Sequence, residues 1–518
     1  MNENKKIKSI VILGGGSAGW MVASALSKII GTNQFNITLV ESESIGTVSV
    51  GEATIPQIRA FNEMIGIDEN DFLKFTQGTF KQGIEFRNWR DKGHAYMHPF
   101  GPYGNNLGGV PFHHYWLKQQ IENSPNNSSQ SFSDKAYTDD LLDYCYEGVA
   151  AKNNRFTRPV NVPNTPMYSV NYAFHFDATL YAKYLRQFSE KLGVKRIEGL
   201  VKDVKRNSDS GFIKSLEIKT SKENEQSISG DLFIDCSGFK GVLIENVMNS
   251  GFEDWRHWLP CDSAVAQASE SINEIKPYTV STAHQSGWQW EIPLQSRIGN
   301  GNVFSSRYMS KDDAVKHLHE NIPSEKIGEP RFLHWVNGKR RKSWIKNCVA
   351  IGLSAGFLEP LESTGLQLIQ ASINRLLSLF PNKEFRQADI DAFNRFADTE
   401  IKQIRDFIIL HYKVTNRTDS AFWNYCREME IPDTLKEKIE LYKANGRIFR
   451  DGYELFSDIS WLSVLNGQGL KTNGYHAMAD LMPSNELDSQ LEKMKNVISE
   501  CQKKTPTHRA YINKYCKS

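Results

Sequence analysis

The chain has 518 residues, and its 62 Lys and Arg nearly balance its 60 Asp and Glu, for a formal net charge of +2. This balance argues against a nucleic-acid or membrane-surface protein, and no apolar stretch of about 18 residues predicts a membrane-spanning helix. Seven scattered cysteines without C-x-x-C spacing suggest reduced thiols, no metal site and a cytoplasmic location.

A nucleotide-binding unit is predicted at the start of the chain. Residues 10–13 predict a buried strand, residues 20–26 a helix, and residues 37–40 a second strand that ends at Glu41. Residues 14–19 form the pattern G-x-G-x-x-G. Glycines there let the backbone approach a pyrophosphate at the helix N-terminus, and an acid roughly 20 residues further on binds ribose. This context predicts an adenine dinucleotide site.

A similar strand occurs far downstream, at residues 230–238 (Gly-Asp-Leu-Phe-Ile-Asp-Cys-Ser-Gly). It is apolar and ends in a turn of small residues. FAD enzymes of the glutathione-reductase type return the chain to the same nucleotide in this way, whereas a simple dehydrogenase does not. FAD is therefore favoured over NAD.

Two loops are predicted in the first quarter of the chain. Residues 50–56, Val-Gly-Glu-Ala-Thr-Ile-Pro, suit a loop that lies against a flavin ring or closes over it. Residues 123–134, rich in Asn, Ser and Gln, predict a surface loop.

One lysine lies in an apolar strand. In the strand predicted at residues 79–89, Phe80, Ile84 and Phe86 fall on one face and Lys81 on the other. Because lysine is seldom buried unpaired, a solvated Lys81 is the ordinary interpretation.

Two tryptophans share a face of another predicted strand, at residues 286–293. Ordinary side-chain packing in a core would be enough to explain Trp288 and Trp290. As a wall between two compartments, they would keep an oxidised flavin away from an aromatic substrate.

Residues 356–366, Gly-Phe-Leu-Glu-Pro-Leu-Glu-Ser-Thr-Gly-Leu, bring together a carboxylate, two hydroxyls and free backbone amides. Apolar spacing predicts a helix over residues 366–380, with Ser363 or Thr364 as the N-cap. The free N–H groups at its start suit an anion such as phosphate or halide. A plain Ser-Thr cap is the simpler interpretation, but it does not account for Glu362 before the cap.

Strands and helices interleave up to about residue 380, and helices dominate afterwards, including those predicted at 389–412 and, behind Pro432, at 433–445. We expect an α/β (α+β) protein with a FAD-binding, glutathione-reductase-type three-layer fold. Residues 1–385 would form the FAD-binding module, interwoven with a substrate-binding region. Residues 386–518 would form a mainly helical C-terminal layer that completes the substrate site, within one compact unit.

Taken in order from residue 8 to about residue 480, these motifs resemble the flavin-dependent halogenases of the tryptophan-halogenase type. The likeness rests on the glycine motif, Gly-Glu-Ala-Thr-x-Pro, Lys81, Trp288-x-Trp290-x-Ile-Pro and Glu-Pro-Leu-Glu-Ser-Thr-Gly. It implies a two-site enzyme in which FADH2, O2 and chloride or bromide give hypohalous acid. The acid would travel through the protein to Lys81 and halogenate an indole-like or other electron-rich aromatic.

The resemblance also implies roles for single residues. Lys81 would deliver the oxidant, Glu362 would stabilise the cationic ring intermediate and take its proton, and the backbone amides of Thr364 and Gly365 would hold halide. The substrate residues would be His98, Phe100, Ser363, Phe456 and Trp461. The residues expected to contact FAD are Gly14, Gly16, Ser17, Ala18, Gly19, Glu41, Gly51, Ala53, Thr54, Asp235, Gly352 and Leu361.

The C-terminal layer departs from the family pattern. Enzymes that act on free tryptophan carry a Tyr-Tyr pair, an acid and Phe-Trp, where this chain has Ala444-Asn445, Asp451 and Leu455-Phe456. A zwitterionic amino acid needs partners for both of its charges. We therefore infer a substrate that lacks them, such as indole or a substituted indole.

Three alternatives stay open at this stage. A flavin monooxygenase that hydroxylates a phenol would not need Lys81 and Glu362 as a distant pair. A halogenase of a carrier-tethered substrate would need an opening for the prosthetic arm, and a non-enzymatic flavoprotein would have no use for Glu362. The single dinucleotide fingerprint implies a separate NADH-dependent flavin reductase. The native substrate, halide preference, regioselectivity and any homo-oligomer stay open.

Overall fold

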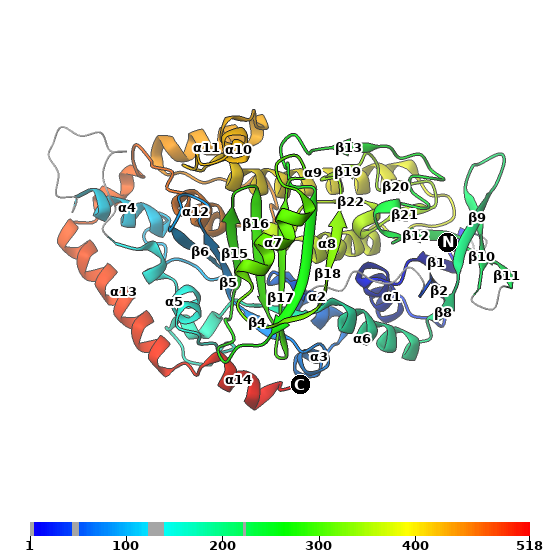
Figure 1. Ribbon diagram of the computed structural model, residues 1–518, viewed down its shortest axis with the longest axis horizontal. Helices are drawn as coiled ribbons and strands as arrows, with labels where there is room; N and C mark the ends of the chain where they lie inside the picture. The colour runs from blue at the N-terminus through cyan, green and yellow to red at the C-terminus, as the bar shows by residue number, and fades with distance from the viewer. Residues whose placement is uncertain (1–4, 44–50, 123–138, 221–223) are drawn as a thin grey trace.

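The computed structural model of the protein describes residues 5–43, 51–122, 139–220 and 224–518. Figure 1 shows the sheet that contains β1 and β2 at one end, a larger sheet in the middle, and a layer of helices at the other end. The loop predicted at 123–134 lies outside the described residues. No described helix combines the length and apolar character needed to cross a bilayer.

The first sheet has six strands in the order β20-β21-β12-β1-β2-β8. The three strands predicted from sequence form its centre: β1 (Ser9–Leu13), β2 (Asn36–Glu41) and β12 (Leu232–Asp235). β1 pairs in parallel with both of the others, and α1 (Ser17–Ile29) follows it. The predicted return of the chain to the nucleotide strand is confirmed.

A small sheet corrects the prediction of a loop at 50–56. It consists of β3 (Gly51–Ala53), β7 (Ala173–Asp177) and β4 (Thr79–Lys81), in that order. Gly51 and Ala53 are paired with β7, and the Thr54 hydroxyl donates to the carbonyl of Phe174 at 2.8 Å. The small residues here serve close packing between strands and do not form a turn. A Cβ on Gly51 would lie only 3.3 Å from the side chain of Ile292. Residue 50 is outside the described residues.

The strand predicted at 79–89 is in fact two strands, β4 and β5 (Gly83–Arg87), which belong to different sheets. Phe80 packs in the core of the nucleotide-binding half, whereas Ile84 and Phe86 pack in the core of the other half, so the prediction of one shared face was wrong. The chain crosses between the sheets where Gly83 lies against the backbone of β6 (Ala95–Pro99), because a Cβ on Gly83 would be 2.5 Å from the His98 carbonyl oxygen.

The large sheet has the order β18-β14-β17-β16-β15-β5-β6. Its remaining strands are β14 (Ser263–Glu270), β15 (Thr279–His284), β16 (Gly287–Pro293), β17 (Arg297–Phe304) and β18 (Lys326–His334). As predicted, Trp288 and Trp290 lie on the same strand and close together, with ring centroids 6.1 Å apart. Gly301 of β17 makes room for Trp290, because a Cβ there would be 2.0 Å from the indole.

The predicted C-terminal helices are present as α8 (Gly365–Ser378), α9 (Gln387–Lys413) and α11 (Asp433–Asn445). The other helices are α2 (Gln57–Ile65), α3 (Glu69–Phe75), α4 (Phe112–Glu122), α5 (Tyr146–Lys152), α6 (Ala178–Lys191), α7 (Lys311–Asn321), α10 (Ala421–Glu428), α12 (Asp458–Gly467), α13 (Ser484–Lys504) and α14 (His508–Tyr515). The other strands are β8 (Lys195–Glu198), β9 (Leu200–Arg206), β10 (Ile213–Lys219), β11 (Glu225–Ser229), β13 (Phe252–Asp254), β19 (Gly338–Arg340), β20 (Trp344–Ile345), β21 (Cys348–Ala350) and β22 (Gly356–Phe357).

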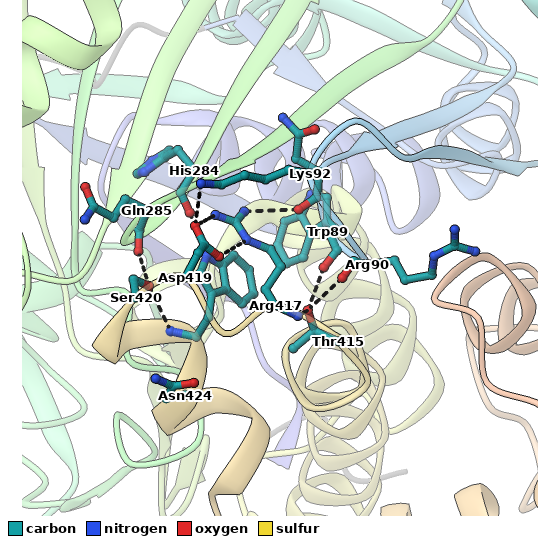
Figure 2. A network of polar contacts seen from close by, with 12 residues as sticks. Trp89, Arg90, Lys92, His284, Gln285, Thr415, Arg417, Asp419, Ser420 and Asn424 are labelled. Carbon is teal, nitrogen blue, oxygen red and sulfur yellow. Dashed lines mark hydrogen bonds and ion pairs between the residues drawn. The ribbon is translucent and has the colours of Figure 1, made fainter.

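A polar network fixes the segment that follows α9 (Figure 2). Arg417 donates to both oxygens of Asp419 at 2.9 Å, and its guanidinium lies 4.6 Å above the Trp423 ring. The Thr415 hydroxyl donates to the carbonyl of Trp89 at 2.7 Å. These contacts tie the end of α9 to the large sheet.

Replacing Arg417 by Met should destabilise the fold by about 2–3 kcal/mol, because hydrogen bonds to a charged and partly buried carboxylate are lost. Arg427→Met is the matched control, since Arg427 pairs with the exposed Glu428 and surface pairs contribute about 0–1 kcal/mol. Urea unfolding measures both, and equal effects for the two variants would contradict the importance of the network.

Candidate active site

Lys81 is fully buried at the end of β4, so the interpretation of a solvated lysine is wrong. Its Nζ donates to Ser363 Oγ at 2.9 Å and lies 5.3 Å from the centre of the Phe100 ring. Burial lowers the pKa of Lys81 to about 7, and the negative charge of Glu362 opposes this effect only in part. Near neutral pH the side chain is therefore divided between ammonium and amine.

Glu362 is a fully buried carboxylate held by two imidazoles. It lies on a short 3-10 turn (Pro360–Glu362), where His98 Nδ1 contacts its oxygens at 3.0 and 3.1 Å and His411 Nε2 contacts Oε1 at 2.8 Å. Burial alone would raise the pKa of Glu362, but the two histidines outweigh it and lower the pKa to about 2. The site thus holds an ionised carboxylate away from water.

The start of α8 has a backbone conformation that the sequence does not reveal. Ser363 adopts the left-handed region, with φ +60° and ψ +36°, which is uncommon for a residue other than glycine. Thr364 is the N-cap of α8, as predicted, but its side chain does not cap the helix. Its buried Oγ1 has no hydrogen-bond partner among the described residues. The first amides of α8 are therefore free of a side-chain cap, while the halide role of Thr364 and Gly365 stays a prediction.

The predicted substrate residues lie along one aromatic wall. The His98 ring is 6.4 Å from Phe100 and 6.5 Å from Phe456. Phe456 stacks on Phe407 with centroids 3.8 Å apart, and Trp461 packs edge-on against Phe407 at 5.0 Å. The structure therefore links His98, Phe100, Phe456 and Trp461 through a chain of ring contacts, and His98 in turn contacts Glu362.

Sequence reasoning missed three residues of this region. Phe407 and His411 share one face of α9, and the only signal for them was their four-residue spacing on a predicted helix. Glu359 lies three positions before Glu362, and both of its buried oxygens lack a hydrogen-bond partner among the described residues. Burial raises the pKa of Glu359 to about 8, although Tyr412 and Trp288 face it and counteract the shift.

The glycine motif forms a tight cradle at the other site. A Cβ on Gly14 would be 2.2 Å from the Cys236 carbonyl oxygen, and one on Gly19 would be 1.8 Å from the Gly14 carbonyl oxygen. α1 begins after Gly16 without a side-chain cap. Ser17 and Ala18 open this helix, and Gly352, at φ +80°, packs against Ala18. The free amides at the start of α1 fit a pyrophosphate.

Two acids assigned to the cofactor already have partners within the protein. Glu41 lies beside Gly15 at the end of β2, where Arg196 binds its carboxylate. Asp235 is fully buried and accepts hydrogen bonds from the backbone amides of Leu243 and Ile244, both at 2.8 Å. Asp235 therefore shapes the loop after β12, and direct contact of either acid with FAD stays a prediction, as it does for the buried Leu361.

Comparisons of the sequence and of the fold with known proteins all find halogenases. The sequence matches the tryptophan halogenase family over residues 9–484. It is 38% identical to tryptophan 7-halogenase RebH of Lentzea aerocolonigenes over 86% of this chain and 83% of that protein. The fold is similar to Xcc4156, a flavin-dependent halogenase from Xanthomonas campestris, with a TM-score of 0.92 and 44% identity over 99% of both chains. It is also similar to tryptophan 6-halogenase SttH from Streptomyces toxytricini, with a TM-score of 0.87 and 31% identity over 98% of this chain and 100% of that one.

Replacing Lys81 by Met should stabilise the protein in a pH-dependent way. Because the pKa of Lys81 is lowered from 10.5 to about 7, the unfolded chain binds one more proton between these values, and wild-type stability rises with pH there. The gain from Lys81→Met is therefore largest at about pH 7 and below, up to about 5 kcal/mol at about 1.4 kcal/mol per pKa unit, and fades toward pH 10.5.

Urea unfolding of both proteins at several pH values measures this difference. Lys74→Met, at an exposed position, is the control and should show no such trend. A constant difference between wild type and Lys81→Met across the pH range would rule out the lowered pKa.

Proposed function

Because the chain belongs to the tryptophan halogenase family, we propose that it halogenates an indole-like substrate at Lys81, with Glu362 as the base. A flavin-dependent halogenase uses FADH2, O2 and halide for electrophilic substitution of an electron-rich ring, and this is the activity of the chain. One observation supports the residue assignment. Lys81 and Glu362 are both fully buried beside an aromatic wall, yet Lys81 bonds to Ser363 and Glu362 to two imidazoles.

The cradle of the first glycine motif would hold FAD. Its residues fit because no side chain caps α1, so the first amides of that helix are free, and because the glycines leave no room for side chains. When bound in its reduced form, FAD would supply hypohalous acid from O2 and halide. Thr364 and Gly365 would bind the halide at the start of α8.

Lys81 would fix the neutral oxidant next to one ring carbon. As an ammonium it can donate hydrogen bonds to hypohalous acid, and as an amine it can carry the halogen. A pKa of about 7 makes both forms available near neutral pH. Confinement in a buried site replaces a bimolecular encounter by a fixed geometry, which accounts for selectivity with so small an oxidant.

Glu362 would stabilise the cationic ring and remove its proton. A protonated aromatic ring is a strong acid, so even a weakly basic carboxylate can accept the proton. The low pKa of Glu362 ensures that the carboxylate is ionised before the cation forms. Its negative charge is most effective in a buried site, where water does not screen it.

The substrate would lack the charges of a free amino acid. Lys438 on α11 pairs with Glu454 at 2.8 Å and with Asp451 at 3.2 Å. The Trp461 indole N–H also donates to Glu454 at 3.2 Å. These charges are thus satisfied among themselves and are poorly suited to bind a zwitterion.

The reducing equivalents would come from a separate NADH-dependent flavin reductase, because the sequence contains one dinucleotide fingerprint. The purified protein should therefore not oxidise NADH rapidly by itself.

Lys81→Ala should abolish halogenated product while oxidation of FADH2 continues, because the oxidant still forms but is no longer delivered. The assay contains FAD, a flavin reductase, NADH, O2, indole and bromide, with product detected by its isotope pattern in mass spectrometry. Full turnover by the Lys81→Ala variant would mean that another residue delivers the oxidant.

Glu362→Gln should slow product formation by roughly 10²–10⁴-fold, the usual contribution of a general base, with FAD binding intact.

Indole should be halogenated with a higher kcat/KM than free tryptophan under the same conditions. The reverse order would contradict the substrate class but not the reaction. A hydroxylated product would instead indicate a monooxygenase, and hydrogen peroxide with unmodified indole would indicate a tethered or different substrate.

A further inference from the structure

His411 is a fully buried histidine with both ring nitrogens in hydrogen-bond contact. Its Nδ1 lies 2.9 Å from the carbonyl oxygen of Phe407, one turn earlier in α9, and its Nε2 lies 2.8 Å from Glu362 Oε1. The Gln468 side chain donates to the His411 carbonyl at 2.7 Å, and the polar network of Thr415 to Ser420 fixes the end of the helix (Figure 2). The ring is therefore held in one orientation.

The partners of the ring determine where its protons are. A backbone carbonyl only accepts hydrogen bonds, so Nδ1 of His411 must carry a hydrogen. A neutral imidazole would then present a lone pair at Nε2 toward the lone pairs of Glu362. The 2.8 Å contact requires a proton between the two atoms. Either His411 is an imidazolium, or Glu362 is a neutral acid.

The surroundings favour the imidazolium. His98 Nδ1 also lies within hydrogen-bond distance of both Glu362 oxygens, and with its hydrogen on Nδ1 it adds a second donor that stabilises the ionised carboxyl group. The His411 ring packs among aromatic side chains, with ring centroids 4.9 Å from Phe86 and 6.0 Å from Trp89. The lowered pKa of Glu362 agrees with this assignment.

Among the other titratable groups that face Glu362, none is required by its hydrogen bonds to be charged. On β4, Lys81 donates to Ser363. On β6, Tyr96 is kept neutral because burial raises its pKa, and His98 needs only its neutral form to donate from Nδ1. His411 is thus the group for which the geometry demands a positive charge.

We propose that His411 is a positioning residue, held as an imidazolium, and that it acts as the permanent counter-ion of Glu362. The proposal rests on the role of Glu362 as the base. It has a consequence for Lys81, because a carboxylate already paired with His411 does not need the lysine as its counter-ion. Lys81 can then lose its proton or bind the oxidant without breaking an ion pair.

The proton balance of the reaction fits this arrangement. The halogen of hypohalous acid forms a bond to the ring carbon, and the O–halogen bond breaks with its electron pair left on oxygen. The ring C–H bond then breaks, its electrons restore aromaticity, and the proton passes to Glu362. It combines finally with the hydroxide from hypohalous acid to give water. His411 keeps its proton throughout and returns unchanged.

Nitrogen NMR of the purified protein, without flavin or substrate, tests the charge directly. In a sample with ¹⁵N-labelled histidine, the His411 signals are identified by their loss in His411→Gln. We expect both ring nitrogens to remain protonated from about pH 6 to 9, whereas an ordinary histidine with a pKa of about 6.5 becomes neutral. A neutral His411 at pH 7 would overturn the proposal without affecting the assignment of the enzyme as a halogenase.

A kinetic comparison tests the role. His411→Gln keeps an N–H donor near Glu362 but removes the charge, so kcat should fall by roughly 10–100-fold, less than the ~10²–10⁴ for loss of a base, with KM little changed. Activity of the variant should also drop at acidic pH, because Glu362 becomes easier to protonate. His284→Gln, at a buried histidine of β15 that bonds to Asn302, is the control and should keep its kcat. Wild-type kcat and pH profile in His411→Gln would exclude the proposed role.

Discussion

The burial of one ionised carboxylate constrains the whole catalytic half of the protein. A charge taken out of water is costly unless it receives hydrogen bonds and a counter-charge, and Glu362 receives them from His98 on β6 and His411 on α9. These three residues come from distant parts of the chain, so the site can form only when the large sheet, the 3-10 turn and the C-terminal helices have assembled. Through His411, the helical layer thus supplies one of the partners of Glu362.

The same turn carries a second carboxyl group in the opposite state. Glu359 is as fully buried as Glu362, but it meets Trp288 and Tyr412 instead of imidazoles, and burial raises its pKa to about 8. The two environments shift the pKa values of these neighbouring carboxyl groups in opposite directions, a pattern that is typical of active sites.

Local signals predicted much of the fold and little of the electrostatics. The strands of the nucleotide sheet, α9 and α11 follow from apolar periodicity, and these predictions were confirmed. The sheet change at Gln82, the strand at Gly51–Ala53 and the left-handed Ser363 were not predicted, because each depends on packing against a distant segment. His411 was missed for the same reason, since nothing within α9 shows that a carboxylate lies opposite it.

The position of Lys81 follows from the crossing of the chain between two cores. β4 belongs to the small sheet next to the nucleotide-binding half, and β5 belongs to the large sheet that carries the aromatic wall. Lys81 is the last residue of β4, so its side chain lies where the two halves meet. Its partner Ser363 occupies a similar position between the turn of Glu362 and the start of α8. If an oxidant is made in one half and used in the other, as proposed, it must pass this boundary, and the hydrogen bond from Lys81 to Ser363 spans it.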